Sequence, residues 1–92
     1  MQEIIKKHLD NYEATTGGLS YIKHNHPDYQ ALLTFGTEAL PTLFNCIDDH
    51  GWCVIALLHE ITKITPVKYE NRGKYHEVIN DWKNWGKENG YL

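Results

Sequence analysis

The stretch that decides the fold is residues 36–66, GTEALPTLFNCIDDHGWCVIALLHEITKITP. Its first half predicts a helix from Glu38 to about Asp48, because apolar side chains recur there every three or four residues. Thr37 is the expected N-cap, since its hydroxyl can accept a hydrogen bond from a free N–H group of the first turn. Pro41 falls within that turn, where a missing N–H is tolerated. The apolar face comprises Ala39, Leu40, Leu43, Phe44 and Ile47.

The second half predicts a helix from Trp52 to Ile64 that is buried over most of its surface. Residues 52–58, WCVIALL, are apolar almost all round, which is typical of a helix at the centre of a core. Residues 48–51, DDHG, separate the two helices, and either aspartate could cap the second one. Thr65 precedes a proline and is therefore disfavoured in a helix, so we expect the second helix to end before it.

Outward from this pair, the sequence predicts further helices on both sides. Residues 2–13 carry one apolar face, and residues 27–36 begin at a proline that suits a first helical position. Paired glycines at 17 and 18 open the longest expected loop, which continues to residue 26. In residues 74–88, apolar side chains again recur at helical spacing, at Tyr75, Val78, Ile79, Trp82 and Trp85.

The expected fold class is therefore all-α, with about five short helices. No segment shows the alternation of apolar and polar residues that a strand requires. We expect a single domain over residues 1–92, with a compact antiparallel helix pair over roughly 36–65 and a closing helix over roughly 74–88. The remaining helices flank and cap the pair.

Size and composition support one small domain. The chain has 92 residues, of which 41% are hydrophobic and 23% are charged, enough to build one core and too few to build a second. Cys46 and Cys53 lie among apolar residues, which favours a reduced, cytoplasmic protein. The N-terminus lacks the features of a signal peptide, and no run approaches the roughly 20 apolar residues of a membrane span, so we expect no contact with a membrane.

The net charge of −3 is unevenly distributed. Residues 1–60 contain three lysines and eight acids, whereas residues 61–92 contain six cations and four acids. This mild asymmetry predicts two solvated surfaces, and it lies far below the basic excess of a dedicated nucleic-acid binder. An association with nucleic acid through the C-terminal segment stays as an alternative, with phosphate contacts from Lys63, Lys68, Arg72, Lys74, Lys83 and Lys87.

Two segments approach the zinc-protease helix motif, but each lacks its second histidine. In one, His59-Glu60 is followed by Lys63 where the motif needs histidine; in the other, His76 is followed by Asn80 at that place. The sequence also lacks a phosphate-binding glycine loop and a nucleophile elbow. It therefore predicts neither an enzyme nor a cofactor.

The cysteines and histidines that lie close together in the sequence are interpreted as structural or solvated residues, not as metal ligands or nucleophiles. Cys46, His50 and Cys53 could converge on zinc only if one helix continued through the glycine between them, and a fourth ligand is lacking. Cys46 has His50 one turn away as a base, yet its apolar neighbours favour a buried thiol over a nucleophile. His24 and His26 could pair on a metal, but two solvated loop histidines are the favoured interpretation.

The decisive stretch resembles a known family. Residues 36–47, the short turn, Trp52, the run ALLHEIT at 56–62 and Pro66 resemble helix A, turn and helix B of a HEAT or armadillo repeat. The chain is also similar to small bacterial and phage proteins in which such a pair is followed by an Arg-Gly step and a closing helix with two tryptophans. Here those residues are Arg72, Gly73, Trp82 and Trp85, and the resemblance covers roughly residues 36–86.

This resemblance implies an α-solenoid type of packing, which larger relatives use as a concave surface for proteins or nucleic acids. Solenoids usually need about three repeats or more to bury a continuous core, and this chain offers one pair. Either the first and last helices cap the pair, or a partner or a second copy of the chain covers an exposed face.

With no catalytic signature, the sequence predicts a non-enzymatic protein–protein interaction module, an adaptor or small inhibitor that binds a larger protein. The likeness to phage proteins sharpens this to a phage-encoded protein directed at a host or defence protein, which could also form a homodimer. Because Trp, Tyr and Arg are enriched at interface hot spots, the candidate contacts are Tyr69, Arg72, Tyr75, Trp82, Trp85 and Tyr91, with Tyr21 and Tyr29 as second choices.

Overall fold

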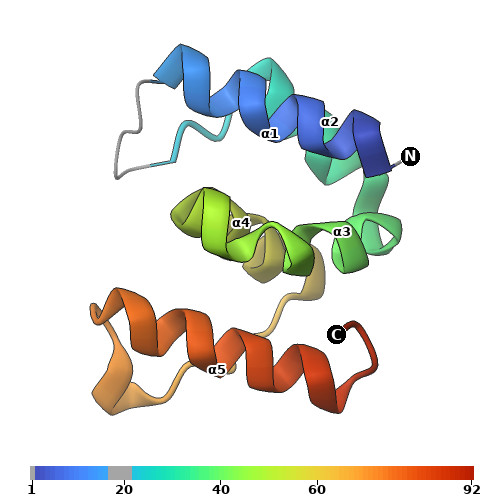
Figure 1. Ribbon diagram of the computed structural model, residues 1–92. Coiled ribbons are helices and arrows are strands. Elements are labelled where there is room, and N and C mark those ends of the chain that lie inside the picture. The colour runs from blue at the N-terminus through green and yellow to red at the C-terminus, as the bar shows by residue number, and fades with distance from the viewer. Residues whose placement is uncertain (1, 17–21) are drawn as a thin grey trace.

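The computed structural model describes residues 2–16 and 22–92, and within these ranges the chain is helical with no strand. The expected all-α class is confirmed. Figure 1 shows the helices stacked in layers, with α1 and α2 at one side, α3 and α4 in the middle and α5 at the other side. The helices are α1 (Gln2–Thr16), α2 (Pro27–Phe35), α3 (Leu40–Asn45), α4 (Ile47–Thr62) and α5 (Tyr75–Glu88). Two 3-10 turns, η1 (Gly36–Ala39) and η2 (Tyr69–Asn71), lie in the connections.

Helix α4 occupies the centre of the stack and contacts α1, α2, α3 and α5. Its residues Val54, Leu57 and Leu58 are fully buried, as the apolar run predicted. The exception is Trp52, which is 40% exposed at the N-terminal part of the run. The other fully buried side chains come from every layer and include Ile5, Leu9, Tyr29, Leu32, Leu43, Phe44, Ile47 and Trp82.

The outermost helices carry polar side chains on the sides that face away from α4. On α1, Lys7 and Asn11 are exposed, and on α5, Asn80 and Asn84 are exposed. Polar outer faces of this kind are typical of helices at the surface of a folded domain.

The predicted helix over 38–48 is wrong in its boundaries. The chain forms η1, then α3, and departs from helical geometry at Cys46, whose N–H is shared between the carbonyls of Thr42 and Leu43. Thr37 lies inside η1 and caps nothing, since η1 and α3 have no side-chain cap. Cys46 is neither glycine nor proline and is buried, so packing rather than local sequence sets this break.

The predicted break over 48–51 survives as a kink within α4. Backbone angles leave the helical range at His50 and Gly51 only, and Asp48 and Asp49 lie in the first turn of α4 without capping it by hydrogen bonds. Instead, both carboxylate oxygens of Asp48 accept hydrogen bonds from Lys83 Nζ, at 2.9 and 2.8 Å. The aspartate cap is therefore corrected to an ion pair that joins α4 to α5.

Other helix ends differ from the prediction by a few residues. Helix α1 continues to Thr16, because the hydroxyls of Thr15 and Thr16 donate to carbonyls one turn earlier. Helix α4 stops at Thr62, where Lys63 takes a left-handed conformation and its N–H bonds to the carbonyl of His59. The glycine part of the predicted loop lies outside the described residues. None of the described helices combines the length and apolarity needed to cross a membrane.

Candidate functional site

The candidate contact residues separate into exposed, half-buried and buried positions. Tyr69 is 82% exposed, and Arg72 is also exposed. Tyr75, Trp85 and Tyr91 are half-buried against the core. Trp82 is only 1% exposed, so it is a core residue and offers no surface to a partner. Of the second choices, Tyr29 is fully buried, and Tyr21 lies outside the described residues.

Tyr69 and Arg72 form the most exposed aromatic feature of the described chain. They lie on the turn between α4 and α5, and we use the name η2 corner for residues 68–74. The Arg72 guanidinium carbon lies 5.3 Å from the centroid of the Tyr69 ring, within the range of a cation–π contact. A large ring in water carries an unfavourable apolar surface, which binding to another molecule would remove.

Asp81 on α5 holds the η2 corner in place. Its Oδ2 atom accepts hydrogen bonds from the Asn71 side-chain amide and from the Lys68 backbone N–H, both at 3.0 Å. These two bonds keep the pKa of the Asp81 carboxyl below its usual range, the Asn71 bond being the larger cause. Two fixed bonds from one buried carboxylate to a short turn limit the conformations of the corner, which lowers the entropy cost of binding.

A second aromatic pair lies at the start of α5, directly after the η2 corner. The Trp52 and Tyr75 rings are tilted with their centroids 5.1 Å apart, and Trp52 remains partly exposed. Gly51 makes this approach possible, because a Cβ atom there would lie 1.7 Å from the Tyr75 hydroxyl. The kink in α4 and the close approach of Tyr75 are thus parts of one arrangement.

Trp82, Trp85 and Tyr91 belong to an internal aromatic cluster instead of an open interface. The Phe44 ring stacks on Trp85 and on Tyr91, with centroids 6.0 and 5.7 Å apart, and Trp82 meets Trp85 edge-on. Gly86 admits the Phe44 ring, since a Cβ there would lie 2.9 Å from a ring carbon. These side chains fix the C-terminal turn against α3 and α5.

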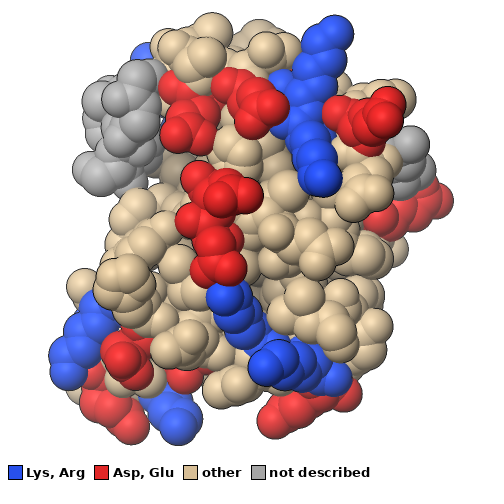
Figure 2. All heavy atoms as spheres, viewed as in Figure 1, with Lys and Arg blue, Asp and Glu red and all other residues tan. Residues whose placement is uncertain are grey.

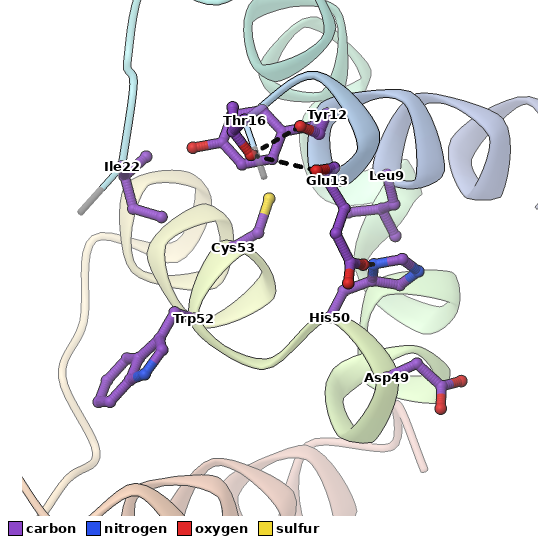
Figure 3. A pocket seen from close by; sticks show the side chains of 9 residues that line it. All are labelled: Leu9, Tyr12, Glu13, Thr16, Ile22, Asp49, His50, Trp52 and Cys53. Carbon is purple, nitrogen blue, oxygen red and sulfur yellow. Dashed lines mark hydrogen bonds and ion pairs between the residues drawn. The ribbon is translucent and has the colours of Figure 1, made fainter. Parts of the chain in front are cut away.

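A small pocket lies between α1 and the N-terminal half of α4 (Figure 3). It has a volume of about 140 Å³, and its walls include Cys53, His50 and Glu13. Burial, with a smaller contribution from Glu13, raises the pKa of the Cys53 thiol to about 12. The thiol therefore stays protonated at neutral pH, which suits neither a nucleophile nor a metal ligand.

His50 bridges two carboxylates of α1. Its Nδ1 atom lies 2.7 Å from a Glu13 oxygen, and its Nε2 atom lies 3.2 Å from an Asp10 oxygen. Each ring nitrogen therefore faces a carboxylate oxygen of a different residue. Because the two nitrogens point to different partners, they do not converge on one metal ion. Burial also raises the pKa of the Cys46 thiol, which corresponds to the buried cysteine expected there.

Of the two loop histidines, His24 is exposed, as its interpretation as a solvated side chain expects, whereas His26 is a structural residue, which corrects that interpretation. His26 caps α2: its Nδ1 accepts from the Asp28 N–H at 3.1 Å, and its Nε2 lies 2.6 Å from the Thr15 hydroxyl. His24 is more exposed and pairs with Glu60 at 3.0 Å. Across residues 2–16 and 22–92, no three His, Cys, Asp or Glu side chains are placed to hold a metal ion.

Sequence reasoning missed Trp52 as a partly exposed residue and Asp81 as the buried residue that holds the η2 corner. Trp52 begins the apolar run over 52–58, which the sequence predicts to be buried. Gly51, just before it, is the only sequence signal for a change of backbone direction there. Asp81 lies beside Val78, Ile79 and Trp82 on the buried face of α5, and an acid on an apolar face is a signal that it has a specific hydrogen-bond partner.

Comparison with protein-family models, with curated proteins and with solved structures finds no match for this chain. The HEAT-like character therefore stays a prediction from the residues named above. The function has to be argued from the geometry of the chain alone.

Proposed function

We propose that this protein is a non-enzymatic protein-binding module, an adaptor or small inhibitor, that contacts a larger protein through the η2 corner and the adjoining Trp52–Tyr75 pair. The observation that carries the proposal is the exposed Tyr69 ring on a turn held by Asp81. Aromatic and arginine side chains on a preorganised surface are typical of interface hot spots. We retain the central helix pair as HEAT-like and the target as a host or defence protein, in line with the resemblance to phage proteins.

The nucleic-acid alternative is supported less well by the geometry. One of its six cations, Lys83, is paired with Asp48, and the remainder lie on a chain whose residues 1–60 are acidic. Figure 2 shows acidic side chains over α1 and α4 on one face, with basic side chains among those over α1, and both basic and acidic side chains over α5. A long polyanion would meet these acids wherever it extended beyond the C-terminal part of the chain.

Affinity capture from a lysate of the cells that make the protein tests the proposal, with nuclease treatment and mass spectrometry of the retained proteins. The tagged wild type is compared with Tyr69→Ala and with Ile4→Ala. Ile4 is a matched control, because it is 51% exposed and lies at the opposite side of the helix stack. We expect one protein to be retained by the wild type and Ile4→Ala and to be depleted about tenfold by Tyr69→Ala.

Two other results of this experiment would contradict the proposed protein-binding function. If Tyr69→Ala retains the same proteins in the same amounts, the η2 corner does not bind them. If only nucleic acid is recovered before nuclease treatment and nothing after it, the nucleic-acid alternative gains the support.

A further inference from the structure

We infer that the η2 corner recognises an acidic segment of its partner protein, with Arg72 binding a carboxylate and Tyr69 packing against the neighbouring apolar side chain. The inference rests on the proposed function and names the chemistry of the partner. It combines three observations: an excess of positive charge, an arginine that already contacts the Tyr69 ring, and a backbone held by Asp81.

The charge of the corner is opposite to that of the rest of the chain. Residues 68–74 contain Lys68, Arg72 and Lys74 and a single acid, Glu70, all of them exposed. Within the described part of the molecule, no ion pair engages these three cations, whereas Lys83 on α5 is paired with Asp48. The Asp81 carboxylate, which accepts hydrogen bonds from Lys68 and Asn71, offsets one more of these charges. The three cations still outnumber the two acids, Glu70 and Asp81, so the corner keeps a positive excess on a chain whose net charge is −3. Such a patch attracts carboxylates over roughly a Debye length.

Arg72 is suited to carboxylate recognition by its chemistry and its position. It is the only arginine in the sequence. Its planar guanidinium can donate two parallel hydrogen bonds to one carboxylate, which a lysine cannot do. The contact with the Tyr69 ring, at 5.3 Å, limits the rotamers of Arg72 before a partner arrives, so less side-chain entropy is lost on binding.

Polypeptide is favoured over nucleic acid by the size of the patch. Three cations on a single turn can neutralise only about three phosphates, whereas dedicated binders make about 6–10 such contacts. A short acidic segment with one apolar side chain can use the turn, Tyr69 and the nearby Trp52–Tyr75 pair together.

Selection from a phage-displayed library of random dodecapeptides on the immobilised full-length chain tests the inference. We expect the enriched peptides to contain an excess of Asp and Glu with at least one apolar residue. Their capture should fall about tenfold in Arg72→Gln, because one charge-assisted hydrogen-bond pair is lost. Arg72→Lys should give an intermediate loss, since it keeps the charge and loses the fork. Circular dichroism confirms that each variant is folded.

The outcomes separate this inference from the function on which it rests. Enrichment of neutral or basic peptides, equal capture by Arg72→Gln, or no enrichment at all overturns the acidic-segment inference. If neutral peptides are enriched and still require Tyr69, the binding module stands and only its partner chemistry is wrong. If acidic peptides bind Tyr69→Ala as well as the wild type, the proposed role of that ring fails.

Two further measurements test whether the η2 corner binds nucleic acid or a second copy of the chain instead. Fluorescence anisotropy with a 20-nucleotide oligo-dT probe should show no binding at physiological salt, and tight binding there would overturn the inference in favour of nucleic acid. Light scattering should give a monomer in both the wild type and Arg72→Gln. An oligomer that Arg72→Gln dissociates would instead assign the corner to the acidic face of a second copy.

Discussion

The two sides of the central helix share apolar packing but differ in their other contacts. On the α1–α2 side, Ile5, Leu9 and Leu32 are fully buried, and histidines add polar contacts: His8 of α1 bonds to Asp28 of α2 at 2.8 Å, and His50 of α4 lies against Asp10 and Glu13 of α1. On the α5 side, the Phe44, Trp82, Trp85 and Tyr91 rings pack on one another. Partly exposed ion pairs are weak and are screened by salt, whereas a buried aromatic cluster is neither.

The largest expected effect comes from the aromatic side. Trp82→Ala should lower the free energy of unfolding by about 3–5 kcal/mol, because it removes a large buried side chain and leaves a cavity. Urea denaturation followed by circular dichroism measures the change. If the variant does not fold, Trp82→Phe should still fold with a smaller loss. A loss below about 1 kcal/mol for Trp82→Ala would contradict the assignment of Trp82 to the core.

The junction between the two sides depends on Gly51. Gly51→Ala should cost about 1–3 kcal/mol, because the new Cβ overlaps the Tyr75 ring and hydroxyl and forces that side chain out of its place. Tyr75→Ala removes the obstacle, so Gly51→Ala should cost much less in that background. A double-mutant cycle by urea denaturation measures the coupling, and strictly additive losses would show that the two residues do not meet.

The two sides should respond at opposite ends of the pH range. Burial raises the pKa of Cys53 to about 12, above that of the unfolded chain, so its contribution is complete below about pH 9 and is lost as pH rises toward 12. The loss at pH 10 should be about 1 kcal/mol, and Cys53→Ala should lack it. Thermal unfolding at pH 8 and pH 10 measures the difference. An equal fall in both proteins would contradict the buried thiol.

On the α5 side, Asp81 should make the free energy of unfolding depend on pH at the acidic end of the range. Its folded pKa lies below the usual range, so its contribution is present above about pH 4 and is lost as pH falls. Asp81→Asn should therefore be less acid-sensitive than the wild type between about pH 4 and pH 2. Amide hydrogen exchange in residues 68–71 should be faster in this variant at pH 7, because the replacement weakens the bonds from Lys68 and Asn71. Unchanged exchange would show that Asp81 does not hold the corner.

The smallest effect belongs to the ion pairs of α1. His50→Gln should cost about 0.5–1 kcal/mol at pH 6 in low salt, since its carboxylate partners are largely exposed. The cost should shrink in 0.5 M NaCl, whereas the cost of the Trp82 replacement should not. Urea denaturation at both salt concentrations tests the contrast. A loss for His50→Gln that salt leaves unchanged would mean that its role is packing.

Periodicity in the sequence predicted the all-α class, the buried α4 and the helix from Tyr75 to Glu88, because these depend on apolar side chains that recur at helical spacing. It failed where tertiary packing decided the backbone. Cys46 carries no local signal for a break, and the Thr37 hydroxyl was expected at a cap that the 3-10 turn replaced. The ends of α1 and α4 differ from the predicted ends by two or three residues for the same reason.

For the candidate site, Tyr69 and Arg72 were predicted from the sequence together with Trp82. The sequence could not show that Tyr69 is exposed and Trp82 is buried. Both tyrosine and tryptophan occur at interfaces and in cores, and burial depends on which helix faces which. Asp81 was missed because its partners, Lys68 and Asn71, become neighbours only after the connection folds back on α5. Contacts of this kind are absent from any single-segment pattern.

The measurement that tests the central claim most directly is site-specific photo-crosslinking in the cells that make the protein. A benzophenone amino acid replaces Tyr69 in one variant and Ile4 in another, and crosslinked products are identified by mass spectrometry. We predict that position 69 crosslinks to one protein, at a segment rich in Asp and Glu, and that position 4 does not. Equal products from both positions, or no protein product from position 69, would contradict the proposal that the η2 corner binds a partner protein.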